Sequence, residues 1–112
     1  SILKNSIYAL LRKLQKESFT PFITIKLEKR ANNTAFISIY DNGIGIEDNI
    51  KDRIFEPFFT TKPSAEAAGV GLYLCREVIL NHQGSILAKS EKDNYTEFLI
   101  TIPISQKRIN NE

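Results

Sequence analysis

Apolar residues recur at steps of three and four along the first segment of the chain, from Ile2 to Leu14. Several lysine and arginine side chains lie between them. This spacing predicts an amphipathic helix with one apolar side. No capping residue precedes the helix, so we expect the sequence to begin inside an element of a longer protein.

Alternation of apolar and polar residues begins at Ile23 and continues to Leu27. A period of two predicts a half-exposed strand. A polar turn follows at residues 31–34, and the run from Phe36 to Tyr40 is rich in β-branched and aromatic residues, which favours a second strand. We expect these two strands to pair as a hairpin.

The middle of the chain returns to helical spacing in two places. Isoleucines one turn apart and acidic residues at the start predict a short helix from Glu47 to Phe55. The stretch from Pro57 to Ala68 has no apolar period and predicts a long mobile loop. A further helix is expected from Gly71 to Asn81, capped near Gly84. The stripe expected to face the core comprises Leu72, Cys75, Val78, Ile79 and His82.

Two more strands are predicted near the C-terminus, Ser85 to Ser90 and Glu97 to Ile102, around a polar turn. Helices grouped with hairpin strands, without strict strand-helix alternation, favour an α+β fold built as a two-layer sandwich. We expect one domain over residues 1–105 and a disordered polar tail over residues 106–112.

Composition narrows the function classes. A chain of 112 residues fits one domain, and a net charge of +2 gives no sign of nucleic-acid binding. No apolar run approaches the length of about 20 residues that a membrane span requires. The lone Cys75 cannot form an internal disulfide. We therefore expect a domain that works in the reducing cytoplasm and makes no membrane contact.

The most informative motif is Asp41-Asn42-Gly43-Ile44-Gly45-Ile46, at the end of the second predicted strand. Counting by twos from Ile37 and Ile39 places the Asp41 carboxylate on the inward face, where it needs a partner. The amino group of adenine is such a donor, whereas guanine presents an acceptor oxygen there. Glycines would let a flat base approach the backbone. The alternative is an Asn-Gly hairpin turn.

A second glycine pair, Gly69-Val70-Gly71, leads into the predicted helix that ends at Asn81. The unpaired N–H groups at a helix start can bind phosphate. An ordinary loop-to-helix turn is the alternative. Leu74 stands where a dinucleotide fingerprint needs its third glycine, and no Gly-Lys-Ser/Thr sequence is present, so those two nucleotide-binding classes are excluded.

Asn5 lies on the first predicted helix. An amide oxygen is a suitable ligand for magnesium, which takes few protein ligands together with phosphate oxygens. A single asparagine on a helix is, taken alone, an ordinary surface polar residue by default.

The order of these features resembles the ATP-binding catalytic domain of two-component sensor histidine kinases. The four boxes in sequence order are Asn5, Asp41-x-Gly-x-Gly, Ile54-Phe55-Glu56-Pro57-Phe58-Phe59-Thr60-Thr61-Lys62, and Gly69-x-Gly-Leu72. The wider group is the Bergerat-fold superfamily, shared with gyrase, the Hsp90 chaperones and the MutL proteins. The resemblance runs from Ser1 to about Pro103. It implies a mixed, mostly antiparallel sheet with helices on one face and a mobile ATP lid.

The resemblance also implies roles for single residues. Asn5 would hold magnesium, Asp41 would bind the adenine amine, and Lys62 would meet the γ-phosphate, although Lys62 is equally consistent with a solvated lysine. Asn5 and Lys62 are the implied catalytic residues. The implied nucleotide-binding set is Asn5, Asp41, Gly43, Gly45, Ile46, Phe55, Thr61, Lys62, Gly69, Val70, Gly71 and Leu72.

Three phenylalanines, Phe55, Phe58 and Phe59, look like the phenylalanine box at the start of the lid. A core cluster that anchors the base of the loop is their other interpretation, and it is compatible with that role. In the resembled family the phosphate goes to a histidine on a separate dimerisation domain and then to a response regulator. His82 is the only histidine here and is expected to be structural.

Three positions depart from the family pattern. Ala67 stands where a further glycine is usual, Tyr8 stands where a basic residue is common, and Ser1 stands where the ATP-hydrolysing relatives carry a glutamate. A serine hydroxyl is a poor base, which disfavours hydrolysis. Two alternatives remain: a degenerate module for signal relay or dimerisation, and a switch ATPase or serine kinase of the same fold.

Overall fold

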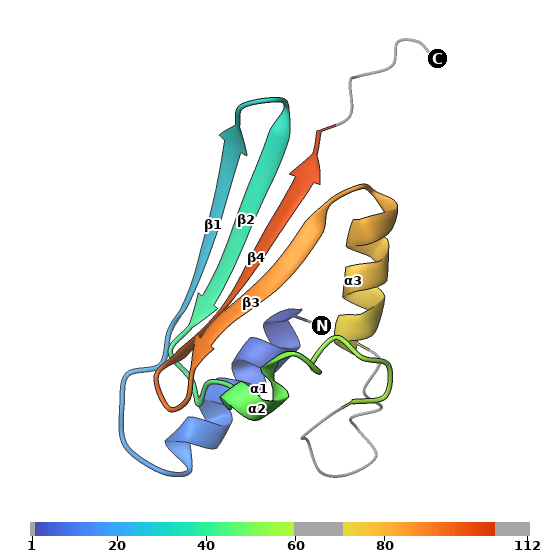
Figure 1. Cartoon of the computed structure of the whole chain (residues 1–112). Coiled ribbons are helices and arrows are strands. Elements are labelled where there is room, and N and C mark those ends of the chain that lie inside the picture. Colours follow the sequence, from blue (N-terminus) through green and yellow to red (C-terminus); the bar gives the residue numbers. More distant parts are fainter. Residues whose placement is uncertain (1, 60–70, 105–112) are drawn as a thin grey trace.

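The computed structural model describes residues 2–59 and 71–104, which form two layers (Figure 1). One layer is a four-stranded sheet in the order β1-β2-β4-β3, and the other consists of helices. In chain order the elements are α1 (Ile2–Leu14), β1 (Ile23–Arg30), β2 (Thr34–Asp41), α2 (Asp48–Lys51), α3 (Gly71–Asn81), β3 (Ser85–Glu91) and β4 (Tyr95–Pro103). The predicted α+β two-layer architecture is confirmed.

All pairings between the described strands are antiparallel. The register sets Ile39 opposite Phe98 and Asp41 opposite Thr96, so these side chains share one face of the sheet. The β1–β2 hairpin is longer than predicted, because Asn32 and Asn33 turn the chain with positive φ angles of 63° and 57°.

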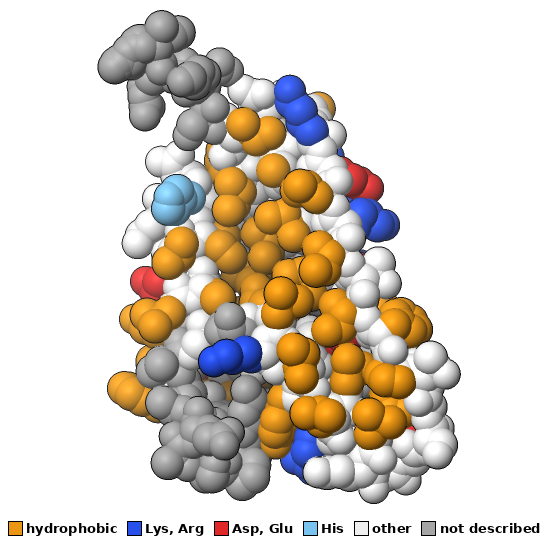
Figure 2. All heavy atoms as spheres, turned by 180° about the vertical axis from the view of Figure 1, so that it is seen from behind, with side chains coloured by type: hydrophobic (Ala, Val, Ile, Leu, Met, Phe, Trp, Pro, Cys, Tyr) orange, Lys and Arg blue, Asp and Glu red, His pale blue; other side chains and the backbone are white. Residues whose placement is uncertain are grey.

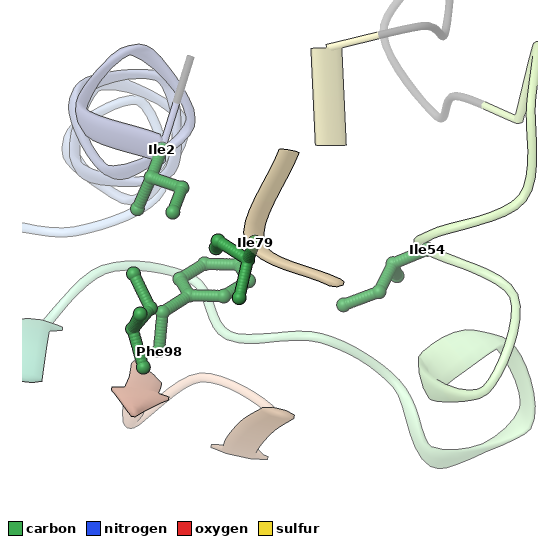
Figure 3. Packing of buried hydrophobic residues seen from close by; sticks show 5 residues of the cluster. Ile2, Ile54, Ile79 and Phe98 are labelled. Atoms are coloured by element: carbon green, nitrogen blue, oxygen red, sulfur yellow. The ribbon is translucent and has the colours of Figure 1, made fainter. Parts of the chain in front are cut away.

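The core lies between the sheet and the helices. Ile2 of α1, Ile54, Ile79 of α3 and Phe98 of β4 point toward one another (Figure 3) and are each at most 8% exposed. Phe55 meets Phe98 edge-on, with ring centroids 6.3 Å apart. The cluster therefore packs α1, α3 and the segment after α2 against the same face of the sheet.

The predicted helix from Glu47 to Phe55 is too long, because α2 comprises only Asp48–Lys51. Beyond it the chain closes single turns: the N–H of Arg53 donates to the carbonyl of Ile50, and that of Glu56 to the carbonyl of Arg53, both at 2.9 Å. Tertiary burial of Ile54, rather than a continued helix, positions this segment.

The end of α3 differs in detail from the prediction. Val78 is 56% exposed and His82 is exposed, so the stripe that contacts the core is narrower than expected. Gln83 adopts the left-handed conformation, and the N–H of Gly84 donates to the carbonyl of Ile79 at 2.9 Å. His82 therefore lies beyond the helix, where the sheet does not cover it.

Most of the predicted loop from Pro57 to Ala68, and the tail at residues 106–112, lie outside the described residues. None of the helices within the described ranges is long and apolar enough to cross a membrane.

Candidate functional site

Asp41 is the last residue of β2, and its side chain is buried on the helix-bearing face with only 1% exposure. The inward orientation predicted from Ile37 and Ile39 is thus confirmed. The backbone N–H of Gly43 donates to Asp41 Oδ1 at 2.9 Å. Burial raises the pKa of this carboxyl group, while the hydrogen bond from Gly43, the hydroxyl of Ser6 and the charge of Lys13 lower it.

The segment after Asp41 runs between α1 and the β3–β4 turn. The N–H of Ile44 donates to the carbonyl of Ala9 at 3.1 Å, and the N–H of Asp93 donates to the carbonyl of Ile44 at 2.6 Å. This path leads to α2 and excludes the hairpin turn that was the alternative interpretation of the motif. The loop that follows the Asp41 carboxylate is thus held by backbone hydrogen bonds to α1 and to the β3–β4 turn.

Each glycine of the motif has its own packing requirement. A Cβ atom added to Gly43 would lie 2.7 Å from the carbonyl carbon of Ala9, and one added to Gly45 would lie 2.2 Å from the carbonyl oxygen of Glu91. Gly45 also has a positive φ of 73°. The structure thus explains both glycines by close backbone approach, and their contact with a bound base stays a prediction.

Three buried hydroxyl groups that the sequence analysis missed lie on the neighbouring elements α1, β3 and β4. Ser6 is fully buried, Thr96 is 4% exposed, and Ser90 is 9% exposed. Ser90 Oγ accepts the N–H of Ile46 at 2.7 Å and lies 3.0 Å from Thr96 Oγ1. The signal that could have found Ser90 and Thr96 is their position on inward strand sites in register with Asp41.

The structure describes some of the remaining candidate residues, while others lie outside the described ranges. Asn5 is half-buried on α1, directly before Ser6, and Gly71 begins α3. Ile46, Phe55, Phe59 and Leu72 pack against the core, whereas Phe58 is 76% exposed. Thr61, Lys62, Gly69 and Val70 lie outside the described residues.

Tyr8, at a position that departs from the family pattern, interacts with Arg12 one turn along α1. The guanidinium group of Arg12 donates to the Tyr8 hydroxyl at 3.0 Å. No cluster of three or more histidine, cysteine, aspartate or glutamate side chains that could hold a metal is found within residues 2–59 and 71–104. The role of Asn5 as a magnesium ligand stays a prediction.

Comparison with known proteins adds independent support. The family model described as "Histidine kinase-, DNA gyrase B-, and HSP90-like ATPase" matches residues 1–106. Sporulation kinase E of Bacillus subtilis is 36% identical over 106 residues, which is 95% of this chain and 13% of that protein. The sensor protein TdiS of Thauera aromatica is 33% identical over 105 residues, 93% of this chain and 18% of that protein.

Solved structures agree with these relatives. The catalytic domain of histidine kinase ThkA matches with a TM-score of 0.69 and 29% identity, over 90% of this chain and 60% of that one. The chain spans less than a fifth of the length of sporulation kinase E and of TdiS. By its sequence and its fold, this chain belongs to the family of histidine kinase-, gyrase B- and HSP90-like ATPases, among the catalytic domains of sensor histidine kinases.

Proposed function

We propose that this domain binds ATP with magnesium and transfers the γ-phosphate to a histidine on a separate dimerisation domain of the same parent protein, from which a response regulator receives it. The observation that carries the proposal is the buried carboxylate of Asp41 at the end of β2. The family match and the histidine kinase relatives support it.

Adenine recognition follows from the chemistry of that carboxylate. One oxygen of Asp41 accepts the N–H of Gly43, and the group retains further acceptor capacity. A buried acceptor without a full set of donors favours a ligand that brings one. The exocyclic amino group of adenine supplies a donor, whereas the oxygen of guanine would face the carboxylate with a second acceptor.

Asn5 would hold magnesium through its amide oxygen, and Gly71 and Lys62 would border the phosphates. A half-buried amide on α1 fits a metal ion that takes most of its ligands from phosphate and water. Bound magnesium would neutralise charge on the phosphates during transfer. The chain's own residues would orient the nucleotide, because phosphoryl transfer depends chiefly on positioning and electrostatic stabilisation.

The phosphate acceptor is proposed to lie on another domain. His82, the only histidine, lies beyond the end of α3, and its Nδ1 is 2.9 Å from the carbonyl oxygen of Val78. A ring held at a helix end is a poor nucleophile for a nucleotide bound beneath the Asp41 loop. We therefore expect no phosphohistidine when the chain alone is incubated with ATP and magnesium, as measured by intact-mass spectrometry under neutral conditions.

Calorimetric titration with magnesium ADP tests nucleotide binding. The chain should bind in the micromolar range, and Asp41→Asn should bind at least about tenfold more weakly because a charged acceptor is lost. Ser38→Ala is a matched control, since Ser38 lies on the opposite face of β2 and bonds to Glu97. Equal affinity of the wild-type chain and Asp41→Asn would refute the role of Asp41. Absence of binding by the folded chain would favour the relay module.

A further inference from the structure

Asn42-Gly43, directly after Asp41, is the one Asn-Gly pair in the sequence. An asparagine followed by glycine is the dipeptide most prone to deamidation, because no side chain shields the backbone nitrogen that attacks the asparagine amide. Glycine also adopts readily the backbone conformations that this attack requires. The loop that follows β2 therefore contains a candidate site of covalent modification.

The fold requires both residues of this pair. Gly43 packs so closely on α1 that an added Cβ atom would lie 2.7 Å from the carbonyl carbon of Ala9. The side chain of Asn42 connects the loop to the segment before β1. Its Oδ1 accepts the N–H of Phe22 at 2.9 Å, and its Nδ2 donates to the carbonyl of Thr20 at 3.0 Å. A chemically labile dipeptide is thus present for structural reasons.

The folded structure keeps the two reacting groups engaged with other partners. The attacking atom is the backbone nitrogen of Gly43, whose N–H donates to Asp41 Oδ1 at 2.9 Å in a buried position. The atom under attack is Cγ of Asn42, whose amide is hydrogen-bonded through both its oxygen and its nitrogen. Lys13 Nζ donates to the carbonyl oxygen of Asn42 at 3.2 Å and restrains the peptide that joins the pair. Attack therefore requires local opening of the loop.

We propose that Asn42 is a site of gated deamidation. When the loop opens, the Gly43 nitrogen gives its proton to water and attacks Asn42 Cγ. The new C–N bond closes a succinimide ring, and the side-chain nitrogen leaves as ammonia. Water then opens the ring at either carbonyl, which gives aspartate or, where the bond to the α-carbonyl carbon breaks, isoaspartate. Overall, water is consumed and ammonia is released.

Either product would damage the nucleotide site, a consequence that rests on the proposed function. An aspartate at position 42 cannot donate to the carbonyl of Thr20, and it adds a negative charge next to Asp41. Isoaspartate lengthens the backbone before Gly43 by one carbon, so the Gly43 N–H moves away from its acceptor. We expect the modified chain to bind magnesium ADP at least about tenfold more weakly. Bound nucleotide should in turn hold the loop closed and slow the reaction.

Peptide mapping by mass spectrometry measures the reaction at Asn42 in the full chain, incubated at neutral pH with and without denaturing urea. Electron-transfer fragmentation distinguishes isoaspartate from aspartate. The rate in urea is the reference for an Asn-Gly pair without a fold. The folded wild-type chain should form both products, at least about tenfold more slowly than in urea.

Two variants test the gate. Asp41→Ala removes the acceptor of the Gly43 N–H, and Ser38→Ala is a control on the opposite face of β2. When folded, Asp41→Ala should react about five- to tenfold faster than the wild-type chain, the effect of one hydrogen bond, whereas the two should react alike in urea. Ser38→Ala should match the wild-type chain under both conditions. Circular dichroism establishes that each variant is folded.

A nucleotide arm tests the link to the proposed function. Magnesium ADP at about ten times its dissociation constant should slow the reaction of the folded wild-type chain about tenfold. Deamidation that proceeds as proposed but is unaffected by magnesium ADP would count against a nucleotide site at this loop and leave the modification site intact.

Three results would overturn the proposal. Equal rates at Asn42 in the folded wild-type chain and in urea would show that the loop does not hold the reacting groups apart. Complete resistance of the folded chain, over a period in which the chain in urea reacts fully, would show that Asn42 is not modified in the folded protein. Both results come from the wild-type chain, so they stand even if Asp41→Ala fails to fold. Equal rates for folded Asp41→Ala and Ser38→Ala would refute the gate.

Discussion

At the scale of single residues, the carboxylate of Asp41 is buried where its charge is poorly solvated. Burial raises the pKa of Asp41, and the Gly43 N–H, the Ser6 hydroxyl and the charge of Lys13 offset that shift only in part. The folded chain therefore binds the proton of Asp41 more tightly than the unfolded chain does. An ionised Asp41 lowers the stability of the free protein and favours a ligand that brings a donor.

This linkage predicts how stability depends on pH. Protonated Asp41 contributes to the free energy of unfolding. This contribution is fully present below the unfolded pKa, near 3.8, and is lost as pH rises through the higher folded pKa. The amide introduced by Asp41→Asn cannot titrate and can still accept from Gly43. We expect this variant to be more stable than the wild-type chain at pH 7, with the difference shrinking toward pH 4. Urea unfolding at several pH values measures it, and a difference independent of pH would contradict the assignment.

Gly43 offers a second test at the residue scale. An alanine here would place its Cβ 2.7 Å from the backbone of Ala9, so α1 or the loop must shift. We expect Gly43→Ala to lower the free energy of unfolding by about 1–3 kcal/mol and to weaken nucleotide binding. Thermal unfolding monitors the loss. The exposed Ser18→Ala is the control, and a Gly43→Ala chain as stable as this control would show that the contact is not tight.

The inward position of Asp41 could be predicted because strand alternation has a fixed period. The complete burial of Ser6 could not, because helical spacing does not tell how closely the sheet approaches each position of α1. The packing of Gly43 on Ala9 could not be predicted either, since it depends on how closely α1 approaches the loop. Tertiary distances, rather than local patterns, decide both.

At the scale of elements, long periodic segments were predicted well and short ones poorly. α1 and α3 have the predicted bounds, because their apolar spacing extends over several turns. The segment after Glu47 has the spacing of a helix, yet only four residues form α2. Ile54 is positioned by the core. A period of so few residues cannot distinguish a helix from successive turns.

Asn42 fixes the start of β1 to the site loop and yields an element-scale prediction. Its side chain accepts from the N–H of Phe22 at 2.9 Å and donates to the carbonyl of Thr20 at 3.0 Å. Asn42→Ala should lower the free energy of unfolding by about 1–2 kcal/mol in chemical denaturation. Asn49→Ala, at an exposed position of α2, should have little effect. Similar losses in both variants would argue against this connection.

At the scale of the whole molecule, apolar side chains remain open on the helix-bearing face of the sheet (Figure 2). Ile25 and Leu27 of β1 are 58% and 72% exposed, and they share this face because they pair with Ile39 and Ile37. The outer side of α1 adds Leu3, Ile7, Leu11 and Leu14. Sequence alternation predicted the inward direction of the strand residues, but it could not show that the helices leave them uncovered.

This open face should bind the dye ANS, whose fluorescence reports accessible apolar surface. Leu27→Lys should reduce the fluorescence. Leu87→Lys, on the opposite face of the sheet and 49% exposed, should change it much less. Equal reductions by the two substitutions would show that the helix-bearing face is not the principal apolar surface.

Asp41 is proposed to bind the amino group of adenine at the end of β2. A crystal structure of the chain with magnesium and a non-hydrolysable ATP analogue would show this contact. We predict the exocyclic nitrogen of adenine at hydrogen-bond distance, about 2.7–3.2 Å, from a carboxylate oxygen of Asp41. A base bound elsewhere, or a cavity beside Asp41 filled by side chains, would contradict it.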